Sequence, residues 1–150
     1  MHDAAVDDGF EPRVRASFAR QRVMETIGAA LTRVDAGAVE IALPYRADLT
    51  QQHGFIHAGI VATILDSACG YAAFSLMPAD VAVLTVEYKI NLLRPADGER
   101  IVARGRVVRS GKTLTVCAGD AVAVTGSEEK VVATMLATIM AIPERDGLRQ

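Results

Sequence analysis

The chain has 150 residues, enough for one domain with a substantial core, and 51% of them are hydrophobic. Only 5% are aromatic and none is tryptophan, so the core is expected to be aliphatic, which favours a sheet-rich fold. The net charge of −2 excludes nucleic-acid binders that depend on a global positive field, and two cysteines without metal-ligand spacing indicate neither a disulfide framework nor a metal site.

The first residues indicate a cytoplasmic protein without a secretory signal. Residues 1–10 are acidic and aperiodic and are expected to be disordered, and no apolar signal segment follows them. The single domain is expected over residues 11–145, with residues 146–150 as a C-terminal tail. From Glu11 to Ile27, apolar residues recur at helical spacing among charged ones, which predicts one amphipathic helix.

The middle of the chain predicts two short strands and then a buried helix. The strands flank the turn Asp35-Ala36-Gly37, and Pro44 ends the second one. Residues 57–74 are apolar nearly all round, as in a helix buried on every side, and Pro78 follows its end. Because Asp66 interrupts this run, no membrane-spanning helix is expected.

The rest of the chain alternates polar and apolar residues with the period of half-buried strands. Turn sequences separate the strands, which are therefore expected to follow one another as hairpins. The predicted fold class is α+β, with a curved antiparallel sheet around one long apolar helix and an additional N-terminal helix. The four strand patterns cover residues 81–93, 100–108, 114–124 and 130–142.

Asp66 is the acidic residue in the apolar run and the first candidate for chemistry. A buried carboxylate without a partner costs several kcal/mol, so it needs an explanation. It could accept hydrogen bonds from a neighbouring strand, pair with an Arg or Lys, or act as a general base or nucleophile in an apolar cleft. The residue and its neighbours leave all three interpretations open.

The predicted start of the buried helix is the second candidate. Free backbone amides of Ala58, Gly59 and Ile60 would point out of its positive end, where they could stabilise an oxyanion. Gly59 would also let a ligand approach the backbone closely. The upstream loop residues could hold a carbonyl group or a water, or could simply be solvated or make local bonds; they are Gln51, Gln52, His53 and His57.

The spacing between these two candidates bears on the oligomeric state. Asp66 follows His57 by nine residues, which in an α-helix is about 13 Å along the axis and about 180° around it. The helix-start amides and Asp66 of one chain therefore cannot face the same carbonyl group. If both take part in one reaction, a second copy must supply one of them, which predicts an obligate two-fold dimer with composite sites.

The pattern Gln51, five residues, His57-Ala58-Gly59, six residues, Asp66 resembles the signature of hotdog-fold acyl-CoA thioesterases. The closest branch is the phenylacetate-pathway type, and the resemblance extends over roughly residues 20–141. It implies a hotdog fold, hydrolysis of an acyl-CoA substrate without a separate cofactor, and a homodimer that assembles further into a dimer of dimers. One departure is that Ala58 stands where the family usually has glycine.

The resemblance also implies roles for individual residues. Asp66 would be the general base or the nucleophile, and the amide of Ala58 would polarise the thioester carbonyl. Gln51 would hold the carbonyl or orient a water, His57 would help to order the loop, and Thr85 would position a water. The phosphates of coenzyme A would lie near basic strand ends and a hairpin, for which the candidates are Arg94, Arg109, Ser110, Gly111 and Lys112.

Two other functions on the same fold remain open from the sequence. A non-catalytic module that binds acyl-CoA would bind coenzyme A without hydrolysing a thioester. A hydratase or dehydratase would pair His53 or His57 with Asp66, although the characteristic spacing of such sites is missing. The acyl pocket is expected to include Ile60, Val61, Tyr71 and Phe74, but its preferred acyl group cannot be read from them.

Overall fold

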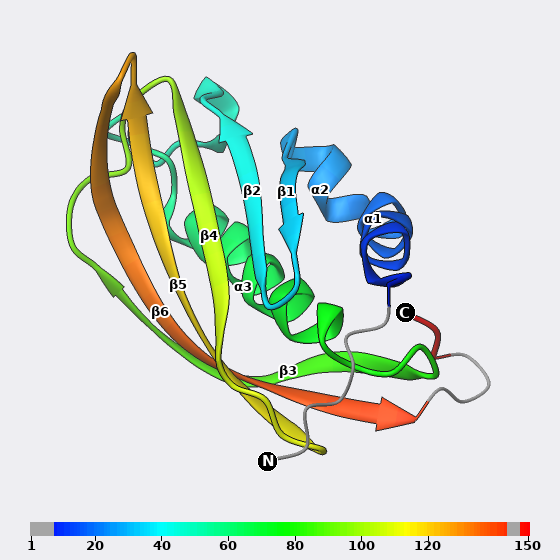
Figure 1. The fold of residues 1–150 in the computed structure, drawn as a ribbon. Helices are drawn as coiled ribbons and strands as arrows, with labels where there is room; N and C mark the ends of the chain where they lie inside the picture. Colours follow the sequence, from blue (N-terminus) through cyan, green and yellow to red (C-terminus); the bar gives the residue numbers. More distant parts are fainter. Residues whose placement is uncertain (1–7, 144–147) are drawn as a thin grey trace.

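The computed structural model describes residues 8–143 and 148–150, which form a curved antiparallel sheet around one long helix (Figure 1). The expected α+β arrangement is confirmed. The six strands lie in the order β1-β2-β4-β5-β6-β3. The elements are α1 (Phe10–Arg20), α2 (Arg22–Ile27), β1 (Ala30–Asp35), β2 (Ala38–Pro44), the short 3-10 helix η1 (Ala47–Leu49), α3 (Ala58–Ser75), β3 (Val81–Leu92), β4 (Arg100–Arg109), β5 (Leu114–Thr125) and β6 (Glu128–Pro143).

The N-terminal region differs from its prediction as one helix. Gln21 has an extended backbone (φ −81°, ψ 92°), ends α1 and begins a new helix, α2. Its side-chain oxygen accepts a hydrogen bond from the Ser67 hydroxyl of α3 at 3.2 Å. The change of direction buries Met24 and Ile27, and no glycine or proline marks it, so tertiary contacts decide where the helix breaks. The predicted disorder of residues 1–10 falls mainly on residues 1–7, outside the described residues.

The first two strands follow the prediction closely. β1 and β2 form an antiparallel hairpin whose connection is Ala36 and Gly37. Gly37 has a φ of +77°, which a residue without a side chain adopts at low cost. Its amide donates a hydrogen bond to the Ser75 hydroxyl at 2.8 Å, so the end of α3 holds this turn in place.

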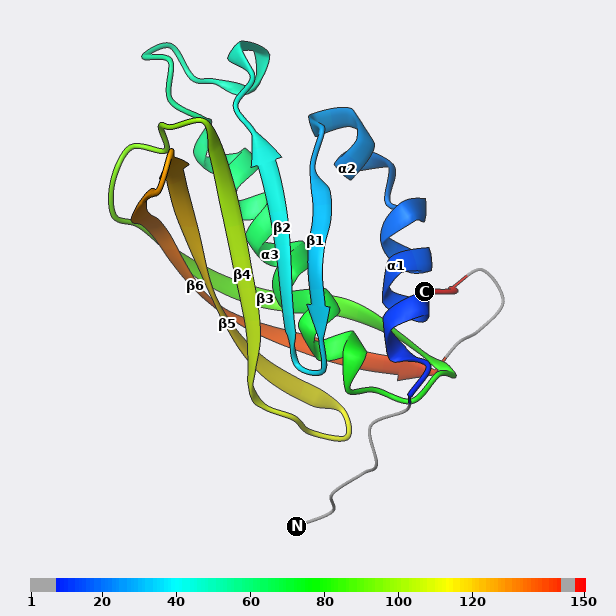
Figure 2. The same ribbon diagram turned by 45° about the horizontal axis from the view of Figure 1, so that its top comes forward.

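The order of the later strands corrects the prediction of a hairpin succession. β4, β5 and β6 do form successive hairpins, but β3 pairs with β6 rather than with β4. The connection after β3 runs along β6, where the amides of Leu93 and Arg94 both donate to the carbonyl of Val132. β3 is therefore an edge strand, while β1 at the other edge is flanked by α1 and α2 (Figure 2).

The core lies between α3 and the concave face of the sheet. Ile64, Leu65 and Ala68 of α3 are completely buried there. β4 approaches the helix so closely that a β-carbon at Gly105 would lie 2.4 Å from the carbonyl carbon of Ala68. Glycine is therefore required at this position, and the close contact fixes the separation between helix and sheet.

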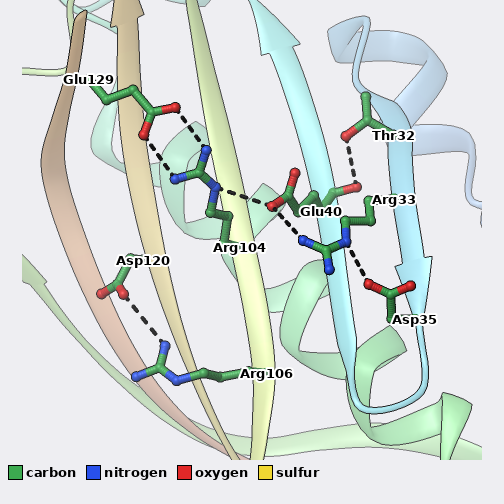
Figure 3. A network of polar contacts seen from close by, with 8 residues as sticks. All are labelled: Thr32, Arg33, Asp35, Glu40, Arg104, Arg106, Asp120 and Glu129. Carbon is green, nitrogen blue, oxygen red and sulfur yellow. Dashed lines mark hydrogen bonds and ion pairs between the residues drawn. The ribbon is translucent and has the colours of Figure 1, made fainter.

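The outer face of the sheet carries charged side chains that pair with one another (Figure 3). Arg104 bonds both carboxylate oxygens of Glu129, at 3.0 and 2.9 Å, and also pairs with Glu40 at 3.2 Å. Arg33 pairs with Asp35, and Arg106 with Asp120. Exposed pairs of this kind contribute only about 0–1 kcal/mol each, but they leave this face without an excess of positive charge.

α3 is the one helix among residues 8–143 and 148–150 whose length and hydropathy would suffice to cross a membrane. Of its 18 residues, 67% are buried inside the protein. Such burial is typical of the central helix of a folded domain.

Candidate active site

One stripe of α3 is not covered by the sheet, contrary to the prediction of a helix buried on every side. The stripe consists of Gly59, Thr63, Asp66 and Gly70, none of which is fully buried. Spacings of four, three and four residues place them on one face of the helix. Asp66 therefore lies on a half-open stripe of small and polar residues, which explains how the apolar helix accommodates it.

Among the residues that the structure describes, one side-chain hydrogen bond holds Asp66. The hydroxyl of Thr85, on β3, donates to its Oδ1 at 2.6 Å. No cation pairs with Asp66 within the described ranges, so the ion-pair interpretation is not supported there. Burial raises the pKa of the Asp66 carboxyl above its ordinary value, and the hydrogen bond from Thr85 opposes this shift in part.

A cavity of about 330 Å³ adjoins Asp66. Its wall includes Thr85, Gly70 and Tyr71, as well as residues from the N-terminal region and the end of the chain. The remaining side chains of the wall are Gln21, Ser67, Val83, Leu84 and Gln150. A carboxylate with a raised pKa beside a cavity is the arrangement expected of a catalytic base.

At the start of α3, the structure leaves one amide free rather than three. His57 is the N-cap residue, and its Nδ1 accepts a hydrogen bond from the amide of Gly59 at 2.8 Å. The amide of Ile60 donates to the carbonyl of His57 at 2.9 Å. The expectation of free amides is therefore wrong for Gly59 and Ile60. Within the described residues, only the Ala58 amide remains available to an oxyanion at this end.

The loop before α3 is ordered by its own polar groups. The side-chain oxygen of Gln51 accepts a hydrogen bond from the His53 amide at 2.5 Å, which leaves its amino group for another partner. The amide of Gln51 donates to the carbonyl of Phe55, and Gly54, with a φ of +84°, closes the turn. Gln51 therefore stabilises the loop as well as lying beside Ala58.

Ala58 and Gln51 belong to a second cavity, of about 470 Å³. Its wall is mostly apolar and includes Phe55 from the loop before α3, Val61 from the first turn of α3, and Leu92 from the end of β3. Arg94 is the charged residue of this wall. The other wall residues are Ile56, Leu93, Pro95, Ala96, Val132 and Ala133.

The two cavities share no residue, so one chain does not bring its two candidate groups together. Asp66 and Thr85 line the smaller cavity, and Ala58 and Gln51 line the larger one. On β3, Thr85 lines the smaller cavity and Leu92 lines the larger one. These two residues are seven positions apart, which corresponds to about 23 Å along a strand. This separation, like the roughly 13 Å expected along α3, is too large for Asp66 and Ala58 of one chain to reach the same carbonyl group.

The residues predicted to hold coenzyme A phosphates are also separated. Arg94 lies beside Val132, whereas the β4–β5 hairpin lies beside Ala141, because the Ala141 amide donates to Thr113 at 2.8 Å. Val132 and Ala141 are nine residues apart on β6, which corresponds to about 30 Å along the strand. Among the described residues, no ion pair involves Arg94, Arg109 or Lys112, although Nη1 of Arg94 donates a hydrogen bond to the carbonyl of Val131 at 2.7 Å. Ser110 and Gly111 lie in the same hairpin.

The expected acyl pocket is partly corrected. Val61 lines the larger cavity and Tyr71 the smaller one. Phe74 is only 1% exposed and lies under the guanidinium of Arg13, 4.6 Å from its ring centre, as part of the core. Sequence reasoning missed Gln21, Ser67 and Gln150 in the wall beside Asp66, because each is far from the motif or hidden among apolar neighbours.

Comparison with known proteins identifies the family. Residues 53–130, more than half of the chain, match the family model described as the thioesterase superfamily. The chain belongs to the thioesterase superfamily. A thioesterase family protein from Silicibacter pomeroyi has a similar structure, with a TM-score of 0.89 and 57% sequence identity. The superposition covers 91% of the present chain and 100% of that chain.

Other relatives of this thioesterase-superfamily protein are more distant. The PaaI protein from the phenylacetic acid degradation operon of E. coli has a TM-score of 0.80 and 20% identity, over 92% of this chain and 96% of that one, which shows the shared fold. VNG_1336C of Halobacterium salinarum, a candidate esterase, is 34% identical over 99 residues. This match covers 63% of the present chain and 65% of that relative, just under two thirds of its length. The predicted membership of the thioesterase superfamily is therefore confirmed, and the likeness to PaaI is one of fold.

Proposed function

We propose that this protein hydrolyses acyl- or aryl-acyl-CoA thioesters to a free acid and coenzyme A. The observation that carries the proposal is the half-buried Asp66 carboxylate, hydrogen-bonded to Thr85 on the uncovered stripe of α3 beside a cavity. The free amide of Ala58 at the N-terminus of the same helix supplies the second requirement, a donor for an oxyanion. Membership of the thioesterase superfamily supports the reaction class.

In the general-base mechanism, the Asp66 carboxylate takes a proton from a water molecule. The water oxygen forms a bond to the thioester carbonyl carbon, and the carbonyl oxygen becomes an oxyanion that accepts a hydrogen bond from the Ala58 amide. The intermediate then breaks its carbon–sulfur bond. The coenzyme A sulfur leaves as a thiolate and takes up the proton held by Asp66, which restores the carboxylate.

Asp66 could instead attack the thioester directly. Its oxygen would then form an anhydride with the acyl group and release the coenzyme A thiolate, and water would cleave the anhydride in a second step. A single turnover in ¹⁸O-labelled water distinguishes the two mechanisms. In the nucleophilic mechanism, water that attacks the Asp66 carbonyl carbon of the anhydride leaves the label in the Asp66 carboxylate and releases an unlabelled acid, whereas in the general-base mechanism the label enters only the product acid.

The composite site requires a dimer, and β3 offers the surface for one. It is an edge strand with large exposed apolar side chains: Leu84, Val86, Tyr88 and Leu92 are each 45–55% exposed. A long apolar edge of this kind favours pairing with another strand. An antiparallel pairing of two β3 edges about a two-fold axis near Tyr88 and Lys89 would bring Thr85 of one protomer close to Leu92 of its partner.

This pairing would join the smaller cavity of one protomer to the larger cavity of the other. Asp66 of one chain and Ala58 of the second would then face one thioester. The β4–β5 hairpin lies on the Asp66 side, since Leu114 and Leu84 both pair with Met140. Arg109, Lys112 and the partner subunit's Arg94 would therefore flank the same composite site, where they could bind the phosphates of coenzyme A.

The test is the turnover of a panel of acyl- and aryl-CoA thioesters by the wild type and by Asp66→Asn. We expect the variant to lose about 10²- to 10⁴-fold in kcat, the usual contribution of a general base, while it stays folded. Asp120→Asn is the matched control, because Asp120 lies on the outer face. Wild-type turnover by a folded Asp66→Asn would refute the role of Asp66. Binding of the thioesters without hydrolysis by the wild type would identify an acyl-CoA-binding module instead.

A further inference from the structure

The side chain of Gln150 joins two elements that lie far apart in the sequence. Its Oε1 accepts a hydrogen bond from the backbone amide of Val83, on β3, at 2.9 Å. Its Nε2 donates to the hydroxyl of Ser17, on α1, at 3.2 Å. The guanidinium of Arg20 contacts the Gln150 carbonyl oxygen. In both ribbon views, residue 150 lies beside α1 (Figures 1 and 2).

These bonds hold Gln150 in the wall of the cavity beside Asp66. Ser17 is 6% exposed, and its hydroxyl is also within 3.2 Å of the Tyr71 hydroxyl, which belongs to the same wall. The Val83 amide that Gln150 binds lies two residues before Thr85, the partner of Asp66. Hydrogen bonds therefore hold both the oxygen and the nitrogen of the Gln150 side-chain amide, in the same cavity wall as the Asp66 carboxylate.

The position of Asp66 indicates which part of a substrate this cavity would receive. The carboxylate must reach the attacking water or the carbonyl carbon of the thioester. The acyl chain on that carbon would then extend into the space beside Asp66. The cavity of about 330 Å³ is near the lower end of the range for ligand pockets, roughly 300–1,000 Å³. None of the described residues that line this cavity is a cation suited to phosphate, whereas Arg94 lies in the wall of the other cavity.

We propose that Gln150 is a specificity-determining residue that limits the length of the acyl group by closing the cavity beside Asp66. The inference rests on the proposed thioester hydrolysis and adds the substrate class, short acyl groups, and the residue that sets the limit. Ser17 is a positioning residue that acts through Gln150, because it holds the amide but does not line the cavity.

The experiment compares wild type, Gln150→Ala and Arg149→Ala with acetyl-, butanoyl-, hexanoyl-, octanoyl- and decanoyl-CoA. Arg149 is the matched control, because it is adjacent in the chain and exposed. We expect Gln150→Ala to raise the ratio of kcat/KM for the long substrates to that for the short ones by on the order of tenfold, since space for even one methylene changes selectivity by 10-fold or more. Arg149→Ala should keep the wild-type profile.

The role of Ser17 is tested in the same series. Ser17→Ala should relax the length limit less than Gln150→Ala and should have no further effect in the Gln150→Ala background, because the two changes act on one bond. Additive effects on the profile would exclude a role through Gln150. A merely structural role would lower the melting temperature without changing the ratio between long and short substrates.

The results separate this inference from the proposed function. An unchanged length profile in a folded, active Gln150→Ala, or a uniform rise of KM for all five substrates, would overturn the inference while hydrolysis stands. If the wild type hydrolyses no thioester, the proposed function fails, and calorimetric binding of S-alkyl-CoA thioethers of the same lengths still tests the limit. Tighter binding of only the long thioethers by Gln150→Ala would support it.

Discussion

At the scale of single residues, the partial burial of Asp66 costs free energy but makes its carboxylate a stronger proton acceptor. Its half-burial disfavours the charged form, and the hydrogen bond from Thr85 compensates for this in part. A carboxylate whose carboxyl group has a raised pKa binds a proton more strongly and is a better general base than an exposed one. The same shift affects the free energy of unfolding. The contribution of the Asp66 carboxyl to it is fully present below the pKa that Asp66 has in the unfolded chain, and is lost as the pH rises through its pKa in the folded protein.

Replacing Thr85 by valine tests this balance. Thr85→Val removes the donor at nearly constant shape, so the pKa of Asp66 should rise further. Because the base must be deprotonated, we expect the acid limb of kcat/KM against pH to move to higher pH. Thr138→Val is the matched control, since Thr138 also donates to a carboxylate, that of Glu87, on the outer face. A limb that stays in place or moves to lower pH would contradict the proton-accepting role of Asp66.

At the scale of elements, the contact between α3 and the sheet depends on small residues. Gly105 lets β4 touch the backbone of Ala68 and Cys69, where a β-carbon would lie within 2.6 Å. Gly119 of β5 approaches the sulfur of Cys69 in the same region. By contrast, Gly70 faces open space on the uncovered stripe. Glycine therefore permits close packing on the side of α3 that faces the sheet, whereas on the uncovered side it leaves open space.

Two glycine substitutions should change stability in opposite directions. Gly105→Ala should lower the free energy of unfolding by about 1–3 kcal/mol or more, because backbone atoms cannot yield to the new methyl group. Gly70→Ala should raise it by up to about 1 kcal/mol through the higher helix propensity of alanine. Urea unfolding at one fixed protein concentration measures both. Equal effects of the two substitutions would contradict the close contact at Gly105.

At the scale of the whole molecule, the proposed site is complete only when two copies meet. Each chain holds the carboxylate and the free amide in different cavities. The uncovered stripe of α3 and the open edge of β3 are the surfaces that a second copy would cover. The proposed dimer therefore accounts for the apolar edge and for the separation of Asp66 from Ala58.

Complementation between two inactive variants tests the composite site. Ala58→Pro removes the amide donor and should leave the helix intact, because proline suits the first helical position and His57 (φ −59°, ψ 138°) has the backbone that precedes a proline. Asp66→Asn removes the base. Random pairing of these variants should restore about a quarter of wild-type activity, since half of the dimers are mixed and each mixed dimer has one intact site.

Co-expression with two affinity tags isolates the mixed dimers for this measurement. The control pairs Asp66→Asn with the double variant Asp66→Asn/Ala58→Pro, which leaves no intact site in any dimer. Purified mixed dimers of the two single variants without recovered activity would show that the amide and the carboxylate do not act in one shared site.

The sequence by itself determined the local features whose cause is also local. The alternation of residues 81–93, the turn at Gly37 and the apolar run of α3 predicted their elements, because periodicity and turn chemistry act over a few residues. The motif from Gln51 to Asp66 indicated the family, and the distance of about 12 Å along the helix axis from Ala58 to Asp66 indicated that the two groups cannot meet within one chain.

Only the tertiary structure decided the features that depend on contacts between distant segments. The pairing of β3 with β6, the break at Gln21 and the uncovered stripe around Asp66 arise from packing, which no local pattern encodes. The bond from the Gly59 amide to His57 is local to the helix start, whereas Gln150 reaches β3 and α1 across more than 60 residues of the sequence. The packing of the folded chain therefore decides which surroundings each candidate group has.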